Sequence, residues 1–138
     1  MKSAPFHEGD FVWVNFPQRE APITPGPRHI AYSIAVTGQG RAYQGMLAYT
    51  TSKPWPGALP EGVRRFSEQQ AKSLGQERAF VLDLRRIAWI PITEAWFPYL
   101  NAPDHGIVGQ APDGLRRALS AEVRNLYEHL ERLGPLWP

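Results

Sequence analysis

Hydrophobic and polar positions divide the chain into a strand-rich first part and a helical end. From Asp10 to Phe16 the sequence reads DFVWVNF, and both alternating sets of side chains are largely apolar, as in a strand buried on two faces. Three further apolar stretches bounded by glycine and proline also predict strands, at residues 29–36, 43–51 and 78–92, the last as one strand or two. A short edge strand is expected at residues 107–109.

Two segments carry helical signals. Ser67 and Gln70 have the spacing of a capping box, and Gly75 suits the end of a helix of about two turns. Near the C-terminus, a shorter helix at residues 113–119 is expected to precede an amphipathic helix with Ser120 as its N-cap and Gly134 as its stop. The apolar stripe of that second helix has a period near 3.6 and comprises Val123, Leu126, Tyr127, Leu130 and Leu133.

The length of 138 residues predicts a single domain. Its fold class is expected to be mainly β (α+β): a small barrel or sandwich of short antiparallel strands, followed by a C-terminal amphipathic helix.

The connections between these elements are rich in proline and glycine. Residues 17–29 read PQREAPITPGPRH, and their prolines exclude a helix or a central strand, which leaves either a slack connection or a functional loop that ends at Arg28. A turn is expected at TGQGR, where Gly38 and Gly40 can take positive φ. Residues 52–62 predict no regular structure.

Composition narrows the cellular setting. The chain has no cysteine, so disulfides and thiolate metal sites are excluded. It has no apolar run near ~18 residues, which predicts no membrane-spanning helix. The first ten residues lack the apolar core of a signal peptide, so a cytoplasmic location is expected.

The basic residues are mostly arginine. The net charge is only +2, but twelve of the fifteen basic residues are Arg, and six of these form the pairs Arg64-Arg65, Arg85-Arg86 and Arg116-Arg117. Arg suits bidentate contacts to phosphate. An arginine-rich genome would produce the same composition, so both interpretations remain open.

Common catalytic and cofactor motifs are missing. His7, His29, His105 and His129 are scattered without metal-ligand spacing, so we expect no metal. There is no G-x-S-x-G elbow and no phosphate-binding glycine loop, and no cofactor is expected.

Two features remain as candidates. Asp83 lies inside an apolar strand with Arg85 two residues further on, which indicates either a structural ion pair or a functional site. Trp55 and the group Trp96-Phe97-Pro98-Tyr99 lie in expected loops, where they would either stack unpaired bases or cover the ends of the fold.

The order of these segments resembles the MazF/PemK family of toxin endoribonucleases. The resemblance covers residues 9–92, and its best parts are GDFVWVNFP, YTTS and RRIAW. It implies an SH3-like barrel that forms a homodimer, cleaves single-stranded RNA without a metal, and is inhibited by a cognate antitoxin in a type II toxin-antitoxin system.

The resemblance also implies site residues. Arg28 matches the family's arginine at the end of the first long loop, and Thr50, with Thr51 beside it, matches the hydroxyl residue at the end of the third strand. The family's Arg-Pro is Arg28-His29 here, and its Asp-Gln is Asp83-Leu84. The further residues expected to bind RNA are Glu20, Thr51, Lys53, Trp55, Asp83, Arg85 and Arg86.

The chemistry expected of these residues follows from RNA itself, which carries its own nucleophile in the 2′-OH. Arg28 would stabilise charge on the phosphate or donate to the leaving oxygen, and Thr50 would position groups by hydrogen bonding. His29 is the nearby residue whose ordinary pKa is close to neutrality, so it is the candidate base, a role that the family resemblance does not supply.

Two alternatives belong to other classes of protein. The same barrel could bind and poison a protein, as in the gyrase-binding CcdB-like toxins, with Trp137 near the chain end as an anchor. It could also be a barrel with neither activity.

Overall fold

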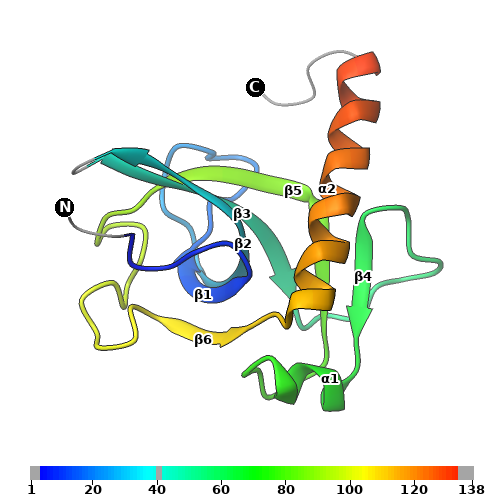
Figure 1. The fold of residues 1–138 in the computed structure, drawn as a ribbon, viewed down its shortest axis with the longest axis horizontal. Helices are drawn as coiled ribbons and strands as arrows, with labels where there is room; N and C mark the ends of the chain where they lie inside the picture. The colour runs from blue at the N-terminus through cyan, green and yellow to red at the C-terminus, as the bar shows by residue number, and fades with distance from the viewer. Residues whose placement is uncertain (1–3, 40–41, 134–138) are drawn as a thin grey trace.

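The computed structural model describes residues 4–39 and 42–133, and it describes no side chain at positions 39, 42 and 129–133. The described residues form a mainly β, α+β fold: one six-stranded antiparallel sheet and two helices (Figure 1). In chain order the elements are β1 (Asp10–Asn15), β2 (Arg28–Gln39), β3 (Ala42–Thr51), β4 (Val63–Phe66), α1 (Glu68–Ser73), β5 (Phe80–Pro91), β6 (Ile107–Gln110) and α2 (Asp113–Leu133).

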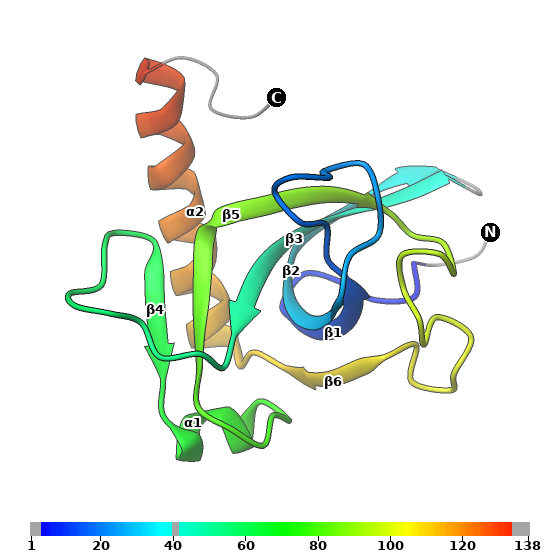
Figure 2. The same ribbon diagram turned by 180° about the vertical axis from the view of Figure 1, so that it is seen from behind.

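The sheet has the strand order β4-β5-β3-β2-β1-β6. Its curvature comes partly from β5, whose register against β3 jumps between the pairs Ala48↔Ile87 and Tyr49↔Asp83. The extra residues of β5 in this bulge bend the strand, and Figure 2 shows β5 turning a corner there. On one side of the bend β5 pairs with both β3 and β4, and on the other side it continues along β3.

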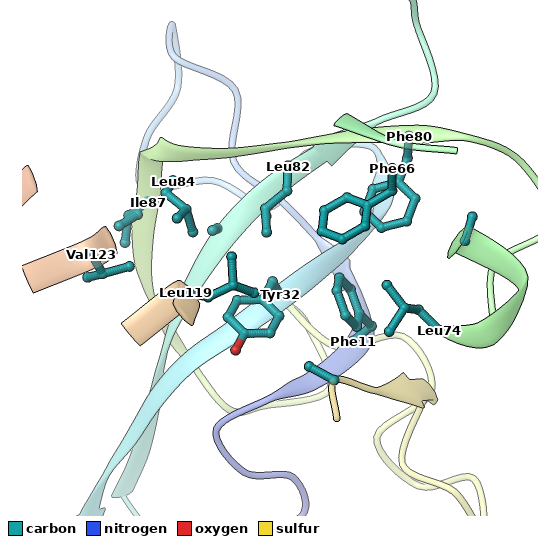
Figure 3. Packing of buried hydrophobic residues seen from close by; sticks show 13 residues of the cluster. Phe11, Tyr32, Phe66, Leu74, Phe80, Leu82, Leu84, Ile87, Leu119 and Val123 are labelled. Atoms are coloured by element: carbon teal, nitrogen blue, oxygen red, sulfur yellow. The ribbon is translucent and has the colours of Figure 1, made fainter. Parts of the chain in front are cut away.

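Hydrophobic side chains fill both faces of the sheet. One cluster lies between the sheet and the two helices (Figure 3), where Leu119 of α2 is fully buried beside Tyr32 of β2. The other cluster lies on the opposite face and includes Phe6 and Phe97, whose ring centroids are 5.2 Å apart. Strands with apolar side chains on both faces, as in DFVWVNF, are what such a two-sided core requires.

α1 lies between the two outermost strands, β4 and β6, which do not pair with each other in the described residues (Figure 1). The end of α1 approaches the β6 backbone so closely that a Cβ atom on Gly109 would lie 1.9 Å from the carbonyl oxygen of Leu74. A Cβ on Gly75 would lie 1.7 Å from the oxygen of Val108, and Gly75 also has a φ of +80°. Only glycine fits at either position.

Much of the expected secondary structure is confirmed. The strand at residues 78–92 is one strand, β5, and the expected edge strand is β6. The capping box is present in full, since the Gln70 N–H donates to Ser67 Oγ at 3.1 Å and the Ser67 N–H donates to Gln70 Oε1 at 2.8 Å.

Two expectations are corrected, and one strand was not expected. The two C-terminal helices are one helix, α2, so Ser120 is not an N-cap; its hydroxyl instead donates to Glu8 Oε1 at 2.6 Å. Residues 63–66 form β4, which the sequence pattern did not indicate. The strands are not all short, since β2 and β5 have 12 residues each, and the hydrogen-bonded sheet stays open between β4 and β6 rather than closing as a barrel.

Some expectations fall outside the described residues. These are the features at Gly40, Gly134 and Trp137, and the side chains of Leu130 and Leu133. Within the described residues, neither helix combines the length and the apolar character needed to cross a membrane.

The contact between α1 and β6 predicts a strong steric effect of one added methyl group. We expect Gly109→Ala to lower the free energy of unfolding by about 1–3 kcal/mol or more, because the new Cβ would overlap a backbone carbonyl that cannot rotate away. Thermal denaturation should show a melting temperature lower by roughly 4–12 °C.

Gly114→Ala is the matched control. Gly114 is in the first turn of α2, and nothing lies within 4 Å of its added Cβ. This variant should melt at or slightly above the parent temperature, since alanine favours helix. Equal melting temperatures for both variants would contradict the close approach.

Candidate functional site

The start of β2 places two candidate residues on opposite faces of the sheet. Arg28 pairs with Asn15 and His29 pairs with Val14, and successive side chains of a strand alternate between faces. Their neighbours differ accordingly: the Arg28 guanidinium lies against the rings of Trp13 and Tyr99, whereas the His29 ring contacts Tyr49. Arg28 and His29 therefore belong to two separate sites.

We call the group around His29 the His29 cluster; it comprises Phe16, His29, Tyr49 and Arg86. The ring centroid of Tyr49 lies 4.9 Å from that of His29 and 5.4 Å from that of Phe16. The Arg86 guanidinium carbon is 3.9 Å from the Tyr49 ring centroid, which is a close cation–π contact. The cluster thus combines an imidazole, a fixed cation and an aromatic surface.

The surroundings of His29 lower its pKa below the ordinary value of 6.5. Burial is the largest cause, because it disfavours the charged imidazolium, and the positive charges of Arg86 and Lys53 act in the same direction. A hydrogen bond with the backbone of Thr50 opposes them. At neutral pH the imidazole is therefore uncharged and able to accept a proton.

Thr50 lies next to this cluster and links strands β3 and β2. Its side chain is buried, and its hydroxyl donates to the backbone oxygen of Ile30 on β2. The neighbouring Thr51 Oγ1 accepts from the backbone N–H of Lys53 at 3.2 Å, which shapes the turn after β3. Thr50 is thus placed to position His29 rather than to contact a ligand directly.

The loop between β1 and β2 is folded rather than slack. Its backbone turns back on itself, and the Gly26 N–H donates to Asn15 O at 3.1 Å. Arg86 Nη2 donates to Pro17 O at 3.4 Å, which ties the loop to the His29 cluster. At the outer part of the loop Ile23 is 89% exposed, and Glu20 is exposed with no ion pair to any described residue.

Asp83 and Arg85 form a bidentate ion pair. Arg85 Nε lies 3.1 Å from Asp83 Oδ1, its Nη2 lies 3.3 Å from Oδ2, and its backbone N–H also donates to Oδ1 at 2.9 Å. These contacts offset the cost of burying the carboxylate. The Arg85 guanidinium carbon lies 5.6 Å from the Trp55 ring centroid, so Trp55 packs against the arginine of this pair.

Arg28 forms part of a pocket of about 340 Å³ on the other face. Its guanidinium carbon lies 5.7 Å from the Trp13 ring centroid and 5.5 Å from that of Tyr99, and its Nη1 donates to the Tyr99 hydroxyl. Asp104 and Gly106 also line this pocket. The sequence pattern indicated Tyr99 as an aromatic residue in a loop. It did not indicate Trp13 or Asp104 as pocket residues, because the loop after β5 meets β1 only in the folded protein and no short sequence segment shows that contact.

Metal-binding side chains lie apart from one another in the part of the chain that the structure describes. Among the described residues, no three His, Cys, Asp or Glu side chains lie together where they could hold an ion. His105 hydrogen-bonds through Nδ1 to the Leu100 backbone oxygen at 2.8 Å, and the His129 side chain lies outside the described residues.

In comparisons with known proteins, no family model and no curated protein matches this chain. The resemblance to the MazF/PemK family therefore rests on the segments quoted above. The function has to be inferred from these side chains and their surroundings.

The cations near His29 predict a measurable titration. In a ¹H NMR titration we expect His29 to titrate below 6.5 and Arg86→Gln to move that pKa upward, because one of the two charges that lower it is removed. Burial remains, so the shift should be partial. Arg117→Gln, which removes an exposed arginine on α2, should leave the value unchanged.

The same lowered pKa has a consequence for stability. The unfolded chain takes up a proton at this imidazole near pH 6.5, before the folded chain does, so the free energy of unfolding should fall as the pH drops from about 6.5 through the folded pKa. His29→Gln should lose this part of the pH dependence. A His29 resonance that titrates above 6.5 would contradict the described surroundings.

Proposed function

We propose that the protein is an endoribonuclease that cleaves single-stranded RNA through its 2′-OH, without a divalent metal, at the His29 cluster. The observation that carries the proposal is a half-buried imidazole with a lowered pKa beside two cations, Arg86 and Lys53. A neutral base next to fixed positive charge is the combination needed to deprotonate a hydroxyl and stabilise a crowded anionic phosphate.

In the proposed reaction, His29 accepts the proton of the 2′-OH. The 2′-oxygen attacks the adjacent phosphorus, and the bond between phosphorus and the 5′-oxygen breaks. Arg86 stabilises the negative charge of the phosphorane, and the Lys53 ammonium gives a proton to the leaving 5′-oxygen. The products are a 2′,3′-cyclic phosphate and a 5′-hydroxyl, so no water is needed for the first step.

The other candidate residues take supporting roles in this proposal. Thr50 positions His29 through its backbone hydrogen bond and fixes the adjoining strand through its hydroxyl. Arg28 contacts the RNA from the opposite face of β2 rather than at the reacting phosphate. Arg85 and Asp83 shape the surface next to Trp55, and Glu20 lies at the outer part of the tied loop.

The biological role that fits this activity is that of a toxin in a type II toxin-antitoxin system. Its support is the resemblance of residues 9–92 to the MazF/PemK family, together with a curved antiparallel sheet and a C-terminal helix. In this proposal the open, curved sheet is a variant of the SH3-like barrel, with α1 lying between the unpaired strands β4 and β6 (Figure 1). A cognate antitoxin would cover the RNA-binding surface.

The second candidate function is a protein-binding toxin on the same fold. Exposed apolar side chains favour it, since Ile23 is 89% exposed and Trp89 on β5 is 51% exposed. Large exposed side chains of this kind commonly anchor protein interfaces. Trp137, the anchor expected from the sequence, lies outside the described residues.

The proposed reaction predicts cleavage of a single-stranded RNA oligonucleotide in excess EDTA. His29→Gln should reduce the rate by about 10²–10⁴-fold, the usual contribution of a general base. Replacing the ribose on the 5′ side of the cut by deoxyribose should abolish cleavage at that bond, because the nucleophile is gone. Mass spectrometry of the products should find the cyclic phosphate.

His7→Gln is the matched control, since His7 is exposed and lies outside the His29 cluster. It should cleave at the parent rate. Cleavage that stops in EDTA, or that continues on the deoxy substrate, would overturn the mechanism. If His29→Gln is as toxic in cells as the parent while purified protein leaves RNA intact, the protein-binding alternative is supported instead.

The exposed Trp89 predicts self-association. Trp89 is exposed and pairs with Met46 on the neighbouring strand β3, and we expect a homodimer that buries this surface. Light scattering at micromolar concentration should give about twice the monomer mass of 15.6 kDa. Trp89→Asp should shift the mass toward that of the monomer with little change in melting temperature, and a monomeric parent would contradict the expectation.

A further inference from the structure

The pocket around Arg28 combines two opposite charges with aromatic walls. Arg28 supplies the cation, Asp104 supplies a carboxylate, and Trp13 and Tyr99 supply rings whose centroids are 6.2 Å apart at 76°. Asp104 Oδ1 accepts from the Gly106 N–H at 3.0 Å, while Oδ2 has no hydrogen-bond partner among the described residues. The pocket therefore offers both free donors and a free acceptor.

These charges restrict what the pocket can bind. A phosphate would be attracted by Arg28 but repelled by the carboxylate of Asp104 in the same pocket, so a simple anion is disfavoured. A planar group that accepts from a guanidinium at one edge and donates to a carboxylate at another satisfies both. It would also stack on the aromatic side chains or on the guanidinium plane, as unpaired bases do in RNA complexes.

Guanine has this pattern among the RNA bases. Its N7 and O6 are two adjacent acceptors that match a bidentate arginine, and its N1–H and N2–H₂ are two adjacent donors that match a carboxylate. Adenine lacks the acceptor pair, and the pyrimidines lack the donor pair. We propose that this pocket binds an unstacked guanine base of the single-stranded RNA substrate, with Arg28 on the N7/O6 edge and Asp104 on the N1/N2 edge.

The pocket is already shaped without a ligand. One donor of Arg28 is used to bind the Tyr99 hydroxyl, and this bond holds the guanidinium against both rings, while its other donors bind no described residue. The loop that carries Asp104 is closed by consecutive turns, and the Trp13 N–H donates to Gly106 O at 3.0 Å.

The same loop has an unusual backbone. His105 is the one described non-glycine residue with positive φ, at 57°, and Gly106 follows at 83°. A Cβ on Gly106 would lie 3.2 Å from the Cβ of Tyr99 and 3.7 Å from that of Trp13, so glycine lets this loop approach both aromatic residues. A strained residue next to a preformed pocket is typical of binding sites.

This inference deepens the proposed function, because it assumes that the substrate is single-stranded RNA. The two faces of β2 then have different functions: the His29 cluster cleaves the RNA backbone, and the pocket around Arg28 selects the base. Arg28 is then a specificity residue, although the family resemblance implies that it takes part in the chemistry.

Fluorescence anisotropy with short deoxyribose oligonucleotides tests the pocket without cleavage. The probes are pentamers of deoxyuridine with one central guanine, adenine, cytosine, hypoxanthine or 7-deazaguanine. We expect the guanine pentamer to bind roughly 5- to 150-fold more tightly than the adenine pentamer, which is the usual discrimination of a good bidentate base contact. Hypoxanthine lacks the N2 amino group and 7-deazaguanine lacks N7, so each should lose about tenfold.

Paired variants assign each edge of the base. Asp104→Asn should remove the difference between guanine and hypoxanthine while keeping that between guanine and 7-deazaguanine. Arg28→Lys should do the reverse, because a lysine keeps the positive charge but loses the bidentate fork. His29→Gln should keep the whole guanine preference. Melting temperatures show whether each variant is folded.

The outcomes separate this inference from the proposed function. Guanine preference without any RNA cleavage would overturn the proposed reaction and leave the pocket supported. Cleavage together with equal binding of all five pentamers, or with a guanine preference that survives both Asp104→Asn and Arg28→Lys, would overturn the pocket. A folded parent protein that binds none of the pentamers would overturn it as well.

Discussion

The pairing of β2 between β1 and β3 is the constraint on which both sites depend. Registers such as Phe11↔Tyr32 and Ala31↔Tyr49 decide which side chains face the helices and which face the loop after β1. A slip of one residue in this register would exchange the faces on which Arg28 and His29 lie. It would also move every apolar side chain of β2 to the opposite face of the sheet. The core on both faces therefore holds the two sites in place, and the bond from the Thr50 hydroxyl to Ile30 O lies at that seam.

Arg86 links several parts of the His29 cluster. It packs over Tyr49, binds the backbone of the loop after β1 through Pro17 O, and lowers the pKa of His29 by its charge. A single side chain thus couples the conformation of the loop to the protonation of the imidazole. Movement of the loop away from the sheet would loosen the guanidinium and change the electrostatics of the site at the same time.

Short sequence patterns correctly predicted the elements that depend on interactions between residues close together in the chain. The alternation in DFVWVNF predicted β1, and the spacing of Ser67 and Gln70 predicted α1 with its capping box. The prediction of Ser120 as an N-cap was wrong, because a serine followed by an apolar stripe can also lie in the middle of a helix. Ser120 lies inside α2, and its hydroxyl donates to Glu8. β4 was missed because four residues after a proline-rich stretch carry too little periodicity.

The candidate site was predictable only in part, because sequence patterns report contacts between nearby residues and not contacts between distant segments. The choice of Arg28, His29 and Thr50 came from local segments, and the period of two along a strand already implies that neighbouring residues face apart. The partners of His29 come from β3, β5 and the turn after β3, and those of Arg28 come from β1 and a loop about seventy residues away. Contacts between residues so far apart in the chain depend on tertiary packing, which a local sequence pattern does not contain.

The position of α1 has a consequence for how this protein can meet others. Both outermost strands, β4 and β6, have only four residues each, and the end of α1 lies against the backbone of β6. Neither strand therefore offers a long open row of unpaired amides and carbonyls to an incoming chain. The longer open edges lie further inside the strand order, because β2 beyond Ser33 and β5 beyond Leu84 pair with β3 alone among the described strands. A chain that adds a strand to this sheet would therefore meet it at those two segments rather than at β4 or β6.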